Sequence, residues 1–134
     1  MTVLATGCFD ILHVGHVTLL ENASDYGDLY VGLNSDRAVR ELKGEGRPVN
    51  PFVARAAVVA ALACVTKVFE IDDVRVATTI RTLSPDFWFK GGDYTLETLD
   101  KDEVAAAKEV GCRIVLVPTI GDYSTTKMLE RMGK

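Results

Sequence analysis

Short runs of apolar and β-branched residues alternate with helix-compatible segments along the whole of this 134-residue chain. The runs lie at residues 3–6, 29–33, 65–69, 87–89 and 114–117, and the helical segments at residues 16–26, 36–42, 52–63, 74–83, 101–110 and about 125–132. Nearly continuous apolar runs are typical of parallel strands that are covered on both faces of a sheet. The sequence therefore predicts an α/β fold: a single doubly wound domain, residues 1–134, with a mostly parallel sheet of about five strands.

Composition and charge exclude several classes of partner. The net charge of −4 argues against a general binder of nucleic acid or of anionic membranes. No apolar run approaches the length of a membrane span, and the N-terminus does not resemble a signal peptide. The three cysteines are far apart and form no CxxC pair, so they predict neither a disulfide framework nor a zinc site and fit a cytoplasmic location.

The chain segments that follow the predicted strands carry most of the distinctive residues. They comprise residues 7–16, 34–36, 90–94 and 118–126. In a doubly wound sheet the carboxyl ends of the strands share one edge, where ligands bind. We therefore expect these segments to form one common site.

The first of these segments contains both histidines of the chain, His13 and His16, at a predicted strand-to-helix turn. A helix N-terminus offers free backbone N–H groups and a positive dipole end, and histidine adds donors that can carry positive charge. The turn matches neither the dinucleotide fingerprint G-x-G-x-x-G nor a Walker A sequence. It is a candidate phosphate site, the alternative being that each histidine is a helix cap or a solvated residue.

Two cations lie in a loop rich in glycine and proline after the second helix. Lys43 and Arg47 are expected there on a mobile segment that carries positive charge to a ligand, the alternative being a solvated surface loop. Arg55 stands in an otherwise apolar helix, so it either extends along the helix to solvent or points into the site.

Two further turns suit a nucleotide. Lys90-Gly91-Gly92-Asp93-Tyr94 offers glycines for close backbone approach, Asp93 as an acceptor for ribose or an amino group, and Tyr94 for stacking on a base. The alternative is a β-turn with an exposed tyrosine. Ser124-Thr125-Thr126 opens the last helix. It is either a second phosphate-binding site or a single N-cap residue accompanied by two hydroxyl residues that have no role in binding.

The segment Gly7-Cys8-Phe9-Asp10-Ile11-Leu12-His13-Val14-Gly15-His16 resembles the His-x-Gly-His signature of the cytidylyltransferase-like nucleotidyltransferases, which have a Rossmann-like fold. The resemblance is greater to the adenylyltransferase domains of ADP-heptose synthases, which have counterparts of the Lys43, Lys90–Tyr94 and Ser124–Thr126 segments. It extends from residue 3 to about residue 131. Glycerol-3-phosphate cytidylyltransferases carry Arg-Thr-Glu-Gly-Ile before their Ser-Thr-Thr, whereas this chain has Thr-Ile-Gly-Asp-Tyr, which counts against CTP.

The resemblance implies a reaction in which an acceptor phosphate oxygen attacks the α-phosphorus of ATP and pyrophosphate leaves. It implies D-glycero-β-D-manno-heptose 1-phosphate as the acceptor and ADP-heptose as the product. A CTP-dependent glycerol-3-phosphate or polyol-phosphate cytidylyltransferase and a non-catalytic nucleotide-binding domain are the alternatives. The resemblance also implies a homodimer and, because this sequence contains no sugar kinase, a separate kinase that supplies the acceptor.

The resemblance assigns roles to individual residues. His13, His16 and Lys43 would be catalytic, the histidines at the triphosphate and Lys43 at the α-phosphate and acceptor. Mg²⁺ is implied, held mainly by phosphate oxygens, with Asp10 as a candidate ligand. The nucleotide-binding residues would be Gly7, Cys8, Phe9, Asp10, Gly15, Arg55, Lys90, Gly91, Asp93, Tyr94, Ser124, Thr125 and Thr126.

Overall fold

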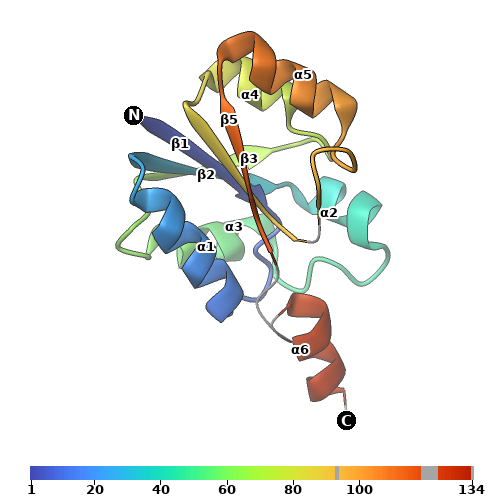
Figure 1. Ribbon diagram of the computed structural model, residues 1–134. Coiled ribbons are helices and arrows are strands. Elements are labelled where there is room, and N and C mark those ends of the chain that lie inside the picture. Colours follow the sequence, from blue (N-terminus) through green and yellow to red (C-terminus); the bar gives the residue numbers. More distant parts are fainter. Residues whose placement is uncertain (93, 119–123, 134) are drawn as a thin grey trace.

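A computed structural model describes residues 1–92, 94–118 and 124–133, with Thr125 described in its backbone only (Figure 1). Strands and helices alternate as the sequence predicts. The strands are β1 (Thr2–Gly7), β2 (Asp28–Asn34), β3 (Lys67–Ile71), β4 (Phe87–Gly91) and β5 (Arg113–Val117). The helices are α1 (Val14–Ser24), α2 (Asp36–Lys43), α3 (Phe52–Ala60), α4 (Ala77–Leu83), α5 (Lys101–Val110) and α6 (Thr125–Met132).

The five strands form one sheet in the order β3-β2-β1-β4-β5, and all of its neighbouring pairs are parallel. The prediction of a doubly wound, mostly parallel sheet of about five strands is confirmed. From β1 the chain continues to β2 on one side, and it later returns to β4 on the other side. The strand order therefore reverses between β1 and β4, which is where such sheets bind ligands.

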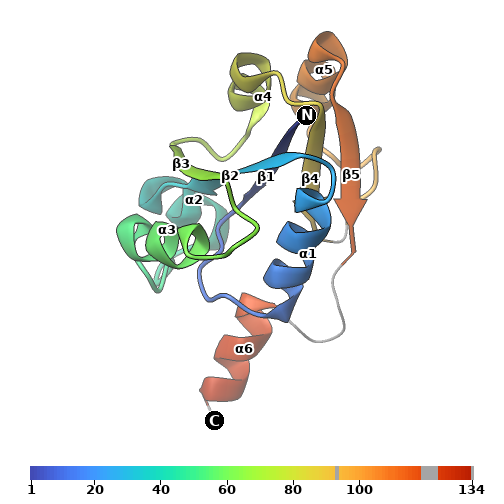
Figure 2. The ribbon, with the colours of Figure 1, turned by 90° about the vertical axis from the view of Figure 1, so that its left-hand side faces the viewer.

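Helices cover both faces of the sheet (Figures 1 and 2). Alternate residues of β1 point to opposite faces: Val3 and Ala5 join a core with α1 and α3, whereas Leu4 joins a core with α4 and α5. Trp88 of β4 is fully buried on the second face. Helix α6 projects from the end of the molecule at which β1 and β4 terminate (Figure 2).

Several helix and strand boundaries differ from the prediction for physical reasons. Helix α1 begins at Val14 rather than at residue 16, because His13 itself is the N-cap. Helix α3 ends at Ala60 rather than at residue 63, where backbone hydrogen bonds of a turn replace the helical pattern. Strand β3 begins two residues later than predicted, since this edge strand includes the exposed polar residues Lys67 and Glu70.

Within the described ranges, no helix has both the length and the apolar character needed to cross a bilayer.

Candidate active site

A cavity of about 310 Å³ lies at the carboxyl ends of β1, β2, β4 and β5. This volume falls at the low end of the range on the order of 300–1,000 Å³ that is typical of ligand sites. Most residues singled out from the sequence line it, together with several that the sequence did not indicate. The lining residues are Thr6, Gly7, Cys8, Phe9, Asp10, His13, Gly15, His16, Leu19, Asn34, Leu42, Lys43, Arg47, Val74, Val76, Lys90, Gly91, Gly92, Tyr94, Val117, Pro118, Ser124 and Thr126.

The turn between β1 and α1 is held in an unusual conformation by Phe9. This residue has φ of 48° and is 4% exposed, so a bulky side chain occupies the left-handed region of the backbone. Its ring lies 5.0 Å from the ring of His16, and it packs closely on Gly7, where a Cβ atom would come within 3.0 Å of the Phe9 ring. The close packing of Phe9 thus sets the direction of the turn that carries both histidines.

The side chains of both histidines accept backbone hydrogen bonds at the start of α1. The backbone N–H of Gly15 donates to Nδ1 of His13 at 3.1 Å, and the backbone N–H of His13 donates to Nδ1 of His16 at 3.2 Å. The two rings stack with their centroids 3.8 Å apart. Because each Nδ1 is an acceptor, the proton of each neutral ring is on Nε2, which leaves an Nε2–H donor on each histidine.

Both imidazoles are neutral in the free protein near pH 7. Burial lowers the pKa of His16 to about 3, with a smaller contribution from the neighbouring His13. Burial also lowers the pKa of His13. The positive charge that these histidines could carry, as the sequence suggests, is therefore not present in the free protein near pH 7. They are neutral hydrogen-bond donors at the positive end of a helix.

Asp10 is a structural anchor rather than an open metal ligand. Its carboxylate accepts from the backbone N–H groups of Val49 at 2.7 Å and Asn50 at 2.9 Å and from Nε of Arg47 at 3.3 Å. Asp10 is only 4% exposed. Both carboxylate oxygens are thus engaged, and residues 47–50 are bound to the histidine turn instead of forming a freely mobile loop.

Lys43 and Arg47 both line the cavity, although they differ in how they are held. Lys43 is exposed at the end of α2, whereas the Arg47 side chain is 14% exposed and pairs with Asp10. The sequence predicts Arg47 to be a loop cation that carries positive charge to a ligand. Its ion pair with Asp10 joins residues 37 positions apart, which no local pattern indicates.

Arg55 does not line the cavity, so the expected direct contact with the nucleotide is not supported. Its guanidinium is buried at 1% exposure and donates to the carbonyls of Cys8, Asn34 and Asn50 at 2.8–2.9 Å. It also pairs with Asp36 at 2.7 Å. Arg55 therefore joins the ends of β1 and β2 to α2 and to the segment before α3.

The β4 end of the cavity is aromatic and basic. The ammonium group of Lys90 lies 4.7 Å from the ring centroid of Tyr94 and 5.7 Å from that of Trp88. Gly92 has φ of 121°, a conformation that glycine adopts without strain. Asp93 lies outside the described residues.

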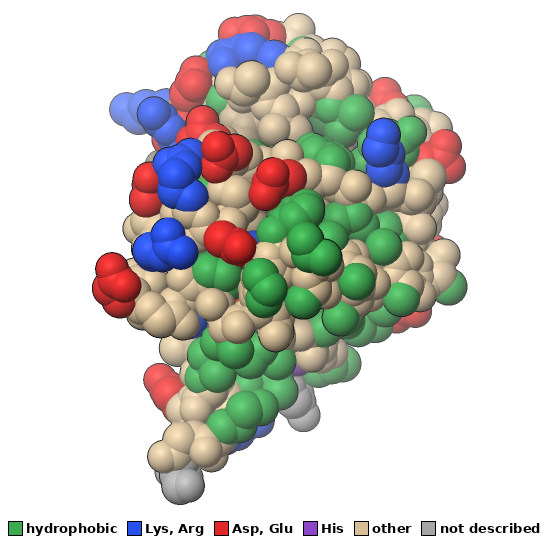
Figure 3. Space-filling model, turned by 180° about the vertical axis from the view of Figure 1, so that it is seen from behind, with side chains coloured by type: hydrophobic (Ala, Val, Ile, Leu, Met, Phe, Trp, Pro, Cys, Tyr) green, Lys and Arg blue, Asp and Glu red, His purple; other side chains and the backbone are tan. Residues whose placement is uncertain are grey.

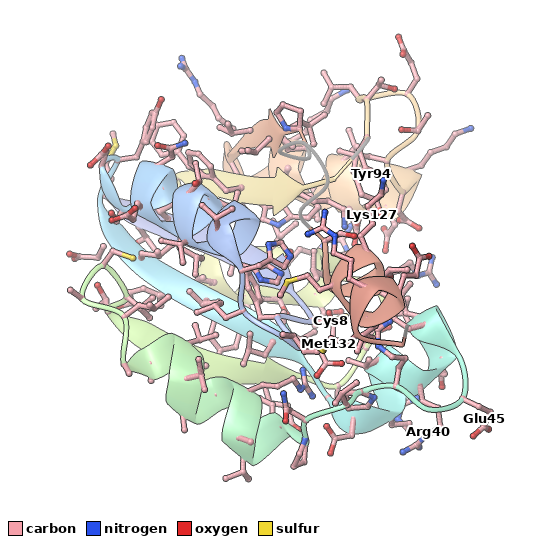
Figure 4. The ribbon with its side chains drawn as sticks, turned by 90° about the horizontal axis from the view of Figure 1, so that it is seen from below. Cys8, Arg40, Glu45, Tyr94, Lys127 and Met132 are labelled. Carbon is pink, nitrogen blue, oxygen red and sulfur yellow. The ribbon has the colours of Figure 1, made fainter. Side chains whose placement is uncertain are left out.

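The N-terminus of α6 closes another side of the cavity. Ser124 is the N-cap of this helix, since its hydroxyl accepts from the backbone N–H of Lys127 at 3.1 Å. Ser124 and Thr126 line the cavity, whereas the side chain of Thr125 lies outside the described part of the chain. Figure 4 looks at this end of the molecule, with Cys8 and α6 near the centre of the view and Arg40 and Glu45 toward its edge.

The segment after β3 is part of the cavity and was not singled out from the sequence. Val74 and Val76 line it, and the backbone N–H of Val76 donates to the carboxylate of Glu103 at 2.9 Å. The amide of Asn34 donates to the carbonyl of Asp73 at 2.9 Å and holds the same segment. Topology alone could have indicated it, because β3 ends at the same edge as the other strands.

Among the described residues there is no group of three His, Cys, Asp or Glu side chains that could hold a metal ion. The engaged carboxylate of Asp10 agrees with this. The described residues therefore do not fit a metal held by protein ligands alone.

Helix N-termini, neutral imidazole donors and three cations around a cavity at the switch point define a nucleotide-binding α/β protein. A family model described as cytidylyltransferase-like matches residues 4–131. The chain therefore belongs to the cytidylyltransferase-like nucleotidyltransferases, as its motifs indicated.

Curated relatives match nearly the whole chain. It is 44% identical over 133 residues to the bifunctional protein HldE of Koribacter versatilis, covering 96% of this chain and 26% of that protein. It is 47% identical over 133 residues to the bifunctional protein HldE of Streptomyces coelicolor, covering 98% of this chain and 28% of that protein. The chain thus spans about a quarter of the length of these relatives.

Solved structures share the fold. The lipopolysaccharide core biosynthesis protein from Thermoplasma volcanium superposes with a TM-score of 0.72 at 25% identity, covering 92% of this chain and 98% of the other. Pantothenate synthetase from Thermus thermophilus superposes with a TM-score of 0.59 at 15% identity, covering 88% of this chain and 56% of the other. The second likeness concerns the fold alone.

Proposed function

We propose that this chain transfers the adenylyl group of ATP to D-glycero-β-D-manno-heptose 1-phosphate and so forms ADP-heptose and pyrophosphate. The observation that carries the proposal is the pair of neutral histidines at the N-terminus of α1, whose Nδ1 atoms are used in capping and whose Nε2–H groups remain as donors beside the cavity. The similarity to bifunctional HldE proteins, over the part of them that this chain covers, supports ATP and a heptose phosphate as substrates.

In the proposed reaction an oxygen of the acceptor phosphate attacks the α-phosphorus of ATP in line. The new P–O bond forms as the bond between the α-phosphorus and the α,β-bridging oxygen breaks, and pyrophosphate leaves with the electron pair. The protein supplies positioning and charge stabilisation rather than a covalent intermediate. His13 and His16 donate through Nε2–H to the triphosphate as charge shifts toward the leaving group, and Lys43 lies near the α-phosphate.

The remaining cavity residues fit the nucleotide. The N-terminus of α6, with Ser124 and Thr126 and the backbone at Thr125, receives the β- and γ-phosphates. The turn backbone around Gly7 and Gly15, with Cys8 and Phe9, borders the phosphates. Lys90, Gly91 and Tyr94 border the nucleoside, and the expected contact of Asp93 with the ribose belongs to this part of the proposal.

Mg²⁺ is proposed to arrive with the nucleotide. The family generally uses this ion, and the described side chains do not form a metal site of their own. Mg²⁺ is often held by substrate phosphates with retained water molecules, and it supplies neutralisation of phosphate charge.

The direct test is pyrophosphate release with ATP, CTP, GTP and UTP, each combined with heptose 1-phosphate anomers, hexose 1-phosphates and glycerol 3-phosphate. Release with ATP and a heptose 1-phosphate alone supports the proposal. Release with CTP and glycerol 3-phosphate would replace it by the cytidylyltransferase alternative. Binding of ATP without release for any acceptor would leave a nucleotide-binding domain.

A homodimer is proposed on the basis of the outer face of α3. Val53 is 78% and Val58 52% exposed, and they lie among exposed alanines with no exposed charge on this helix. Figure 3 shows hydrophobic side chains gathered on this face of the molecule. Such a neutral apolar face can pair with its own copy about a two-fold axis.

Sedimentation equilibrium of the wild type and of Val53→Glu tests the dimer. The wild type is expected to have the mass of a dimer and the variant that of a monomer, and equal masses for the two proteins would contradict the proposal.

A further inference from the structure

Arg47 is a loop cation whose direction is set by the buried carboxylate of Asp10. Its Nε donates to the carboxylate of Asp10 at 3.3 Å, and the Asp10 side chain is 1% exposed. The backbone of the neighbouring residues Val49 and Asn50 is bound to the same carboxylate. One carboxylate therefore fixes both the position of the segment and the orientation of the guanidinium that lines the cavity.

The cations that line the cavity divide into two groups. Lys90 lies against the rings of Tyr94 and Trp88, near the end of β4. Lys43 and Arg47 lie near the thiol of Cys8, at the end of β1. Burial raises the pKa of this thiol, and the positive charges of Lys43, Arg55 and Arg47 oppose that effect. The guanidinium of Arg55 is occupied, because it donates to backbone carbonyls and to Asp36. Lys43 and Arg47 therefore remain as the cations that can meet a ligand at the end of β1.

We propose that Arg47, oriented by Asp10, binds the phosphate group of the acceptor and holds it against the α-phosphate of ATP. The inference rests on the proposed function, in which two anions must approach each other. A phosphomonoester carries a charge of about −1.5 to −2 at neutral pH. Lys43 and Arg47 place cationic donors on the side of the cavity where the two phosphates would meet, and the helix N-termini of α1 and α6 remain for the triphosphate.

A fixed guanidinium suits this role better than a free one. Its Nη groups form a planar fork that matches two phosphate oxygens, and the fork loses little freedom on binding because Nε is already held. Lys43, exposed at the end of α2, can instead follow the α-phosphate as its geometry changes. Arg47 is thus assigned to acceptor binding and Asp10 to positioning.

The test compares Arg47→Gln with Arg40→Gln, which removes the same charge from the exposed side of α2, outside the cavity (Figure 4). Michaelis constants are measured separately for ATP and for heptose 1-phosphate. Arg47→Gln is expected to raise KM for the sugar phosphate about tenfold to a hundredfold, the scale of one lost hydrogen bond to a charged group. KM for ATP should stay within about twofold, and Arg40→Gln should change neither constant.

Three kinetic results would overturn the assignment: equal constants in both variants, a rise confined to KM for ATP, or a fall in kcat with KM for the sugar phosphate unchanged. Arg47→Lys should give an intermediate KM, because a point charge remains but the fork is lost. Thermal melting of each variant shows whether it is folded.

A binding measurement separates this inference from the proposed function. Heptose 1-phosphate is titrated into the wild type and Arg47→Gln, each saturated with a non-hydrolysable ATP analogue. Binding of heptose 1-phosphate that is at least about tenfold weaker in the variant supports the role of Arg47. This holds even if the wild type shows no turnover, because absence of turnover would refute adenylyl transfer but not acceptor binding by Arg47. Equal binding by both proteins, or no binding by either, overturns it.

Discussion

His16 uses its two ring nitrogens for different purposes. Nδ1 accepts the backbone N–H of His13 and so completes the start of α1, while Nε2 is left with a proton beside the cavity. Burial keeps the ring neutral, so it can donate a hydrogen bond without first losing or gaining a proton. At the residue scale, one side chain therefore serves helix capping and the proposed catalysis.

Exchange of His16 for glutamine should separate these two roles. Glutamine at the third helical position can still accept the N-cap N–H, but its amide does not reproduce the position of Nε2–H. We expect kcat to fall by at least about a hundredfold, the scale for one lost transition-state donor, with little change in melting temperature. Steady-state kinetics and thermal melting measure both effects.

The control for this exchange is Glu21→Gln, on the exposed side of α1. It should retain both wild-type turnover and wild-type stability. Turnover by His16→Gln close to that of the control would show that the Nε2–H group takes no part in the reaction.

The low pKa of His16 also predicts how stability depends on pH. The folded protein leaves this ring neutral down to about pH 3, whereas the unfolded chain protonates it below about pH 6.5. The unfolded state thus binds more protons in this window, and the free energy of unfolding should rise with pH by up to about 1.4 kcal/mol per unit from this residue. Above about pH 6.5 the contribution is fully present and constant.

Urea unfolding of the wild type and of His16→Gln at several pH values between 4 and 8 measures this dependence. The variant should show a shallower rise between about pH 4 and 6.5 and the same slope as the wild type above it. Parallel curves throughout would mean that His16 titrates equally in both states.

At the scale of elements, Arg55 connects parts of the chain that are distant in sequence. From α3 it reaches the carbonyls at the ends of β1 and β2 and the carboxylate of Asp36 at the start of α2. The carbonyl of Asn50 completes its contacts. The position of the histidine turn relative to α2 thus depends on one buried guanidinium.

Removal of this guanidinium should therefore destabilise the fold. Arg55→Met preserves much of the side-chain volume but leaves the carbonyls of Cys8, Asn34 and Asn50 without this donor. We expect a loss of about 3–5 kcal/mol in the free energy of unfolding, because each buried acceptor left without its donor costs about 1–3 kcal/mol. Urea unfolding at low temperature measures it, with Arg40→Met as the exposed control. A loss below about 1 kcal/mol would contradict the proposal that Arg55 holds these elements together.

The bounds of helices α5 and α6 were predicted correctly, because residues at their ends give local capping signals. Helix α5 is bounded by the N-cap Asp100 and by Gly111 with φ of 72°, and α6 is opened by the N-cap Ser124. Helix α3 has no such C-terminal signal, and the predicted helix was too long. Edge strand β3 was misplaced because its exposed polar residues hide the strand pattern.

The site was predictable to the extent that it follows from topology. At the whole-molecule scale, alternating strands and helices predict that residues 7–16, 90–94 and the start of α6 meet at one edge, and residues from each of these segments line one cavity in the described part of the chain. The roles of Arg47, Arg55 and Asp10 depend on contacts between residues 37–47 positions apart. No periodicity or local motif encodes such contacts, so the sequence could single out these residues but not the partners that hold them.

The central claim is that an acceptor phosphate attacks the α-phosphorus of ATP in this cavity. It is tested most directly with heptose 1-phosphate labelled with ¹⁸O in its phosphate group, followed by mass spectrometry of both products. ADP-heptose should carry all of the label and pyrophosphate none, since every acceptor oxygen stays with the sugar nucleotide. Label in pyrophosphate, or consumption of ATP without a labelled sugar nucleotide, would contradict it.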